Sequence, residues 1–147
     1  MYGFLIATHN VLAWLVLLIG GLAIVRAVSR SATWSDVDTG VVRRLTLLVH
    51  LQLLAGLGLW FVSPAVTAAR GSMGDTMKDP ALRRLVVEHP SLMVLAVIAA
   101  TVSGVRVKKA SGSAAMARNA LIGTLITLAL VAAVIPWQRL VTKWTQG

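Results

Sequence analysis

The sequence predicts an all-α integral membrane protein built as a four-helix bundle. Of the 147 residues, 57% are hydrophobic and only 13% are charged, whereas soluble domains average about 25% charged residues. Four apolar runs approach the roughly 20 residues that a helix needs to cross a bilayer. None of them alternates as the strands of a membrane β-barrel do. The composition excludes most soluble enzyme classes, and the length predicts one transmembrane domain, residues 1–147.

The predicted spans cover about residues 5–26, 45–66, 90–107 and 118–136. No Lys or Arg precedes the first span, so we do not expect a cleavable signal peptide. The last two spans are short when counted strictly. Their polar interruptions are small hydroxyl residues that bond back to the helix backbone, namely Thr101, Ser103, Thr124 and Thr127.

Basic residues predict the orientation of the spans. The first and third connections carry four basic residues each, which places them in the cytoplasm and both termini outside. The second connection balances its basic residues with acidic ones, and the tail has only Arg139 and Lys143. Trp60, Trp137 and Trp144 then fall near the outer interface. The net charge of +9 is therefore explained by basic residues at the ends of the spans, which set the topology and contact anionic headgroups of the lipid bilayer. We expect the bilayer as partner and no nucleic acid.

A short interfacial helix is predicted between spans two and three. Asp79 is a good N-cap and Pro80 suits the first helical position. We expect this helix to place Arg83 and Arg84 among the headgroups and to bend into the membrane at Pro90. Gly71 and Gly74 before it indicate a turn.

Few side chains remain that are capable of chemistry. Cysteine is absent, which excludes thiol redox chemistry and iron–sulfur clusters. Charge is nearly absent from the middle of the spans, which counts against pumps and proton-coupled transporters. Three histidines are left. From the helical rise, His9 and His89 lie about 9 Å and 13 Å from the centres of their spans on the outer side, and His50 about 8 Å on the cytoplasmic side.

Two histidines at similar depth on different helices provide what a bis-imidazole haem requires. Small residues on these spans favour either a slot for the macrocycle or close helix packing; they include Ala13, Gly20, Ala23, Ala27, Ala55, Gly56, Gly58, Ala96, Ala100 and Ser103. His89 follows Glu88 at the interface and is alternatively a solvated or ion-paired residue with no ligand role. His50 is alternatively a hydrogen-bonding residue between helices, near Gln52.

Several segments resemble a family of small four-span bacterial membrane proteins labelled cytochrome b-like. They are His50-Leu51-Gln52-Leu53-Leu54-Ala55-Gly56, Phe61-Val62-Ser63-Pro64, Met77-Lys78-Asp79-Pro80 and Glu88-His89-Pro90 followed by Leu92-Met93. Thr8-His9, Trp14-Leu15-Val16 and the tail Ala133-Val134-Ile135-Pro136-Trp137 fit the two ends of that family. The resemblance covers nearly the whole chain and implies haem b, electron transport and a bacterial inner (plasma) membrane.

One position departs from the resemblance. Relatives have a second histidine on the third span where this chain has Thr101. The resemblance therefore implies at most one haem here, on the outer side between His9 and His89, and leaves His50 without an evident partner.

Two functional hypotheses follow. The first is a b-type cytochrome-like subunit with haem b ligated by His9 and His89, with no independent catalytic site. The alternative is a non-catalytic accessory subunit of a larger respiratory or photosynthetic membrane complex, without its own haem, which packs against other membrane subunits.

Overall fold

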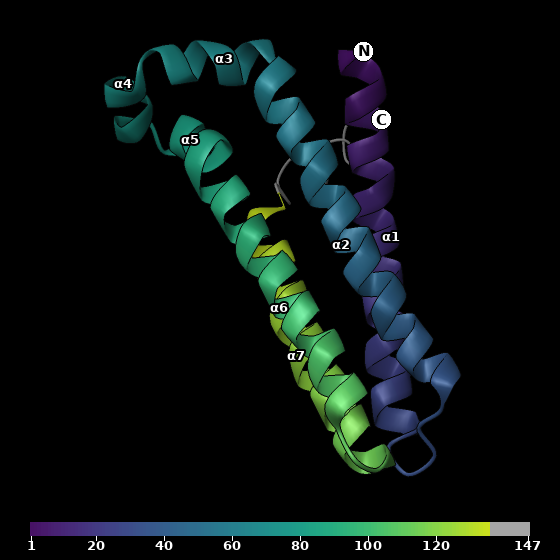
Figure 1. The fold of residues 1–147 in the computed structure, drawn as a ribbon. Coiled ribbons are helices and arrows are strands. Elements are labelled where there is room, and N and C mark those ends of the chain that lie inside the picture. The colour runs from purple at the N-terminus through teal and green to yellow at the C-terminus, as the bar shows by residue number, and fades with distance from the viewer. Residues whose placement is uncertain (136–147) are drawn as a thin grey trace, which may run out of the picture.

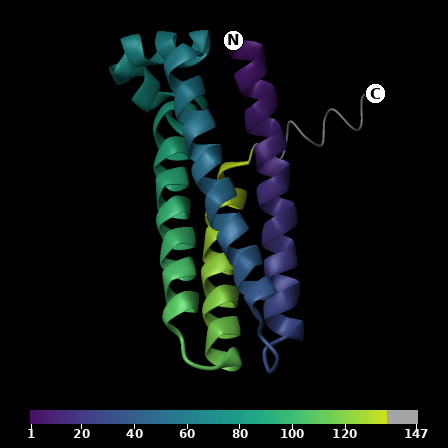
Figure 2. The same cartoon turned by 45° about the vertical axis from the view of Figure 1, so that its right-hand side comes forward.

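Four long antiparallel helices dominate the computed structural model, which describes residues 1–135. They are α1 (Tyr2–Ser29), α2 (Asp36–Val62), α6 (His89–Lys109) and α7 (Ser113–Val134) (Figures 1 and 2). Each is long and apolar enough to cross a membrane, α6 together with the turns that precede it from Pro80 onward. Within residues 1–135 no strand occurs. The predicted all-α membrane four-helix bundle is confirmed, and the chain is a multi-pass membrane protein.

The order of the helices around the bundle determines which side chains meet. Helix α1 packs against α2 and α7, and α6 packs against the same two helices. Helices α1 and α6 are therefore diagonal neighbours across the bundle centre. Every long helix contributes to the core that fills this centre, which includes Val16, Leu45, Val49, Met93, Ala96 and Val131. Large apolar side chains such as Leu18, Leu54, Ile98 and Leu125 point outward, as expected of a lipid-facing surface.

The ends of the helices differ from those of the predicted spans. Most of the helices are longer, because a helix can continue past the last apolar residue of a span. Helix α2 begins at Asp36, nine residues before the predicted start at residue 45. It ends at Val62 rather than at residue 66, because Pro64 disfavours helical backbone at Ser63 and starts a new helix. Helix α7 begins five residues before the predicted residue 118. Its predicted end, residue 136, lies outside the described residues, as do Trp137, Arg139, Lys143 and Trp144.

Short helices connect α2 to α6 at the end of the bundle that the sequence predicts to be the outer one. They are α3 (Pro64–Gly71), α4 (Met73–Lys78), α5 (Pro80–Arg83) and the π-helical turn η1 (Arg84–Glu88). The predicted start at Asp79 is confirmed, since its carboxylate accepts hydrogen bonds from the backbone N–H groups of Ala81 and Leu82. Helix α3 crosses the end of the bundle, whereas α5 leads through η1 into α6 (Figure 1). The predicted turn near Gly71 falls at Ser72, between α3 and α4.

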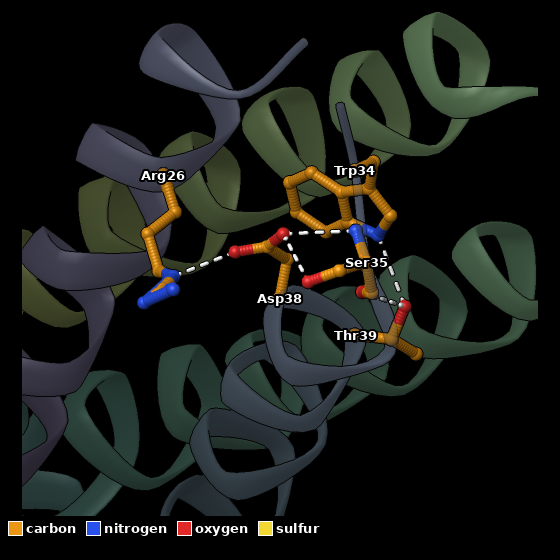
Figure 3. Close-up of polar contacts among 5 residues, drawn as sticks. All are labelled: Arg26, Trp34, Ser35, Asp38 and Thr39. Atoms are coloured by element: carbon orange, nitrogen blue, oxygen red, sulfur yellow. Dashed lines mark hydrogen bonds and ion pairs between the residues drawn. The ribbon is translucent and has the colours of Figure 1, made fainter. Parts of the chain in front are cut away.

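At the opposite end, a buried carboxylate joins α1 to α2 (Figure 3). Asp38 is fully buried and accepts hydrogen bonds from the backbone N–H and hydroxyl of Ser35, at 2.9 and 2.8 Å. The guanidinium of Arg26 donates to the other carboxylate oxygen at 2.6 Å. Beside it, the Trp34 indole N–H donates to Thr39 Oγ1 at 3.0 Å. Asp38 therefore caps α2 and holds it against α1.

Two of the predicted small residues, Gly20 of α1 and Ser103 of α6, pack closely against α7. A Cβ on Gly20 would lie 2.7 Å from Leu128 Cδ2. A Cβ on Gly123 would collide with the Ser103 side chain and lie 3.1 Å from its Cα. Because backbone atoms approach at the second site, the collision there has no flexible side chain to relieve it. The packing interpretation of Gly20 and Ser103 is thereby supported.

Gly123→Ala tests this contact. We expect the free energy of unfolding to fall by about 1–3 kcal/mol, because the added methyl group forces α6 and α7 apart. Gly21→Ala is the matched control, since a Cβ there meets no atom within 4 Å. That variant should gain stability, because alanine is the better helix former. Thermal unfolding in detergent followed by circular dichroism measures the stability of both variants. An equal change in their free energies of unfolding would contradict a close contact between Gly123 and Ser103.

Asp38→Ala tests the contact between α1 and α2. We expect a loss of about 3 kcal/mol, because the variant leaves Arg26 without its buried partner and removes the cap. Asp36→Ala removes an exposed carboxylate from the same helical turn and should change the stability much less. A comparable loss of stability in both variants would show that it comes from removing a negative charge near the start of α2, and not from the contacts of Asp38.

Candidate ligand site in the outer half of the bundle

Two histidines from diagonal helices meet near the outer end of the bundle. The ring centroids of His9 on α1 and His89 on α6 lie 6.1 Å apart, with 53° between the ring planes. Both residues are half-buried. The chain thus brings together two predicted site residues separated by 80 positions in the sequence.

A buried glutamine contacts one histidine of this pair, His9. Gln52 of α2 is only 5% exposed, and its amide nitrogen lies 3.2 Å from His9 Nε2. From the sequence alone, Gln52 is only a neighbour of His50 and is not predicted to belong to the site. The available signal was a polar amide within an apolar span, which needs a partner on another helix. Its position two residues from His50 directs it to the opposite side of α2.

The site retains unused hydrogen-bonding capacity. His9 Nδ1 and Gln52 Oε1 are buried and have no hydrogen-bond partner. Turning the Gln52 amide over exchanges its oxygen and nitrogen, so one polar atom of Gln52 and one nitrogen of His9 stay unpartnered in either orientation. Such atoms are rare in native structures and costly in an apolar surrounding. A buried ionisable residue inside a membrane bundle therefore marks this position as a candidate functional site.

A glycine makes room for the His9 ring. A Cβ on Gly56 of α2 would lie 3.3 Å from His9 Cε1 and 3.6 Å from Nδ1. The glycine thus lets the imidazole lie directly against the α2 backbone. This small residue serves the candidate site, unlike Gly20, which accommodates Leu128.

His89 lies where α7 ends. The imidazole is next to the backbone of Val134, and Arg84 donates to the carbonyl oxygen of Ala133 at 2.6 Å. These contacts lie at helix-end carbonyls that lack partners within α7. Glu88 pairs with Arg83 at 2.7 Å, so its carboxylate is engaged away from His89. The alternative of a Glu88–His89 ion pair is therefore not favoured.

His50 lies apart from the other two histidines. Its Nδ1 lies 2.8 Å from the carbonyl oxygen of Thr46, one turn earlier in α2. Thr101 is exposed, and its hydroxyl donates to the carbonyl oxygen of Val97. His50 therefore bonds to its own helix and does not extend the His9–Gln52–His89 cluster.

Together, the fold and this cluster define a multi-pass four-helix membrane protein with a two-histidine site in one half of the bundle. Among residues 1–135, no group of three or more His, Asp or Glu side chains is arranged to hold a metal ion. No known protein family, curated protein or solved structure matches the chain.

A double-mutant cycle tests the contact between His9 and Gln52. Removing both side chains as His9→Leu and Gln52→Leu should reveal a coupling free energy of about 0.5–1.5 kcal/mol, typical of hydrogen bonds between membrane helices. The cycle of His50→Leu with Gln52→Leu is the control, because these side chains point to different sides of α2. Unfolding in mixed micelles supplies the free energies; zero coupling in the first cycle would contradict the contact.

Proposed function

We propose that the chain is a b-type cytochrome-like membrane subunit that holds one haem b between His9 and His89 and takes part in electron transfer in a bacterial inner membrane. The observation that carries the proposal is the separation of 6.1 Å between the two imidazole rings. A bound haem supplies one-electron redox chemistry at its iron. The protein supplies the two ligands and an apolar surround.

The ring separation agrees with ligation of a single metal. An imidazole nitrogen lies about 2 Å from a metal that it binds, and its ring centroid lies roughly 1 Å farther away. Two histidines that held one iron between them would therefore have ring centroids about 6 Å apart. His9 and His89 meet this condition from diagonal helices, which leaves α2 and α7 to flank the site.

Gln52 has the role of a positioning residue. Ligating histidines usually hold one ring nitrogen in a hydrogen bond and give the other to the metal. His9 has one half of this division, with Nε2 next to the Gln52 amide, while its unpartnered Nδ1 lies on the ring edge that faces Gly56. Gln52 thereby fixes the orientation of the ring, and Gly56 allows it to lie against α2.

The macrocycle needs space next to the two imidazole rings. One described cavity, of about 370 Å³, lies at the outer end, and a second lies near Ser103 and Asn119; neither is lined by His9 or His89. Side chains around the pair therefore have to move aside on binding. The resemblance to cytochrome b-like proteins favours such a site, and the exposed position of Thr101 favours one haem over two.

The second candidate function is a non-catalytic accessory subunit of a larger respiratory or photosynthetic complex. The positions of these two cavities favour it, because neither offers a large cofactor space next to the polar cluster. In that case His9 and Gln52 act as a structural contact, and partner subunits cover the apolar outer surface. Absorption of the purified chain separates the two functions.

We expect the chain, purified after expression with ample haem precursor, to show a Soret band and, on reduction, the sharp α-band of a six-coordinate b-type haem. His9→Ala and His89→Ala should each remove most of this absorbance, because each removes one of the two histidines that would hold the iron. Visible spectra of the oxidised and dithionite-reduced protein measure the effect.

His50→Ala is the matched control and should leave the spectrum unchanged. A wild-type chain that folds but carries no haem would exclude the proposal. Equal loss of absorbance in all three variants would show that the histidines support folding rather than ligation.

A further inference from the structure

A second site lies at the outer end of the bundle, separate from the histidine pair. The cavity of about 370 Å³ opens there between α2, the short outer helices and the start of α6. It is lined by Trp60, Arg70, Met73, Val86, Val87 and Ser91. All but the arginine and the serine present mainly apolar surface.

Arg70 differs from its basic neighbours in this region. Lys78 pairs with Asp75 and Arg83 with Glu88, and Arg84 donates to a backbone carbonyl. Among residues 1–135, by contrast, the Arg70 guanidinium has neither a hydrogen-bond acceptor nor an acidic partner. Its positive charge and all five N–H donors are available to a ligand.

Aromatic contacts hold the Arg70 guanidinium in place. Its Cζ lies 3.8 Å from the centroid of the Trp60 ring and 5.6 Å from that of Phe61. Trp60 is itself fixed, because its indole N–H donates to the carbonyl oxygen of Val86 at 3.0 Å. Stacking on an indole covers one face of the guanidinium and leaves its in-plane N–H groups free. This geometry suits two-point binding of a phosphate.

The wall of the cavity is firmly packed. Val66 and Ala69 of α3 and Val86 of η1 form a buried cluster behind it. The buried Thr76 hydroxyl donates to the carbonyl oxygen of Ala69 at 2.6 Å and ties α4 to α3. The site therefore combines a held cation with an apolar surface, at the end of a bundle whose sides face lipid.

We propose that this cavity binds one anionic phospholipid, with its phosphate on Arg70 and an acyl chain along the apolar wall formed by Met73, Val86 and Val87. Charge complementarity selects the phosphate, and the membrane setting supplies the acyl chain. A zwitterionic lipid carries a compensating positive charge beside its phosphate, which Arg70 disfavours. Inorganic phosphate lacks the apolar portion that the wall contacts.

Native mass spectrometry of the full chain, titrated in neutral detergent with phosphatidylglycerol, tests the proposal. We expect one retained lipid per chain, and Arg70→Gln should weaken its apparent affinity about tenfold, as for a lost charge-assisted hydrogen bond. Lys78→Gln removes the same charge from an exposed position of the same connection and should leave the affinity near that of the wild type.

Arg70→Lys keeps the positive charge but loses the planar guanidinium that stacks on Trp60, so we expect an intermediate affinity for phosphatidylglycerol. It serves as the second test if Arg70→Gln fails to fold, which circular dichroism reports. Retention of phosphatidylcholine as tight as that of phosphatidylglycerol would overturn the proposal. So would equal weakening by Arg70→Gln and Lys78→Gln, or binding of inorganic phosphate with the same affinity.

Discussion

Inside a bilayer, a polar group that lacks a protein partner has no water to bond, and this constraint organises the structure. At the cytoplasmic end predicted for the bundle, Asp38 precedes the apolar span but is buried in protein, and it meets the same constraint fully, since Ser35 and Arg26 occupy its carboxylate. In the outer half, His9 and Gln52 meet it only in part. The first cluster is explained by folding alone. The second carries a cost that folding does not require, and for this reason we assign function to it.

The sequence predicted the architecture well because the bilayer imposes a length and an apolar composition on every span. It also predicted the helix start at Asp79, where the capping chemistry is local. It did not predict the early start of α2, because a count of apolar residues stops at charges that the helix retains. The short helices α3 and α4 escaped prediction for a similar reason, since they lie outside any apolar run.

The candidate site was only partly accessible from the sequence. Depth along each span indicated that His9 and His89 share one half of the bundle. Gln52 could not be assigned to them, because its direction depends on how α2 rotates against α1. Thr101 is a similar case. It is exposed because of the face that α6 turns toward the other helices, which the sequence does not specify. The separation of the two ring centroids, on which the haem proposal rests, follows from the diagonal placement of α1 and α6 and is a property of the tertiary structure.

The haem proposal requires that His9 and His89 together ligate one iron. Electron paramagnetic resonance of the oxidised, haem-loaded chain tests it most directly, because two imidazole ligands give a low-spin ferric centre. We expect a low-spin signal in the wild type and its loss in His89→Ala, where any residual haem held by His9 alone would be high-spin. A high-spin wild type, or a His89→Ala variant that stays low-spin, would contradict it.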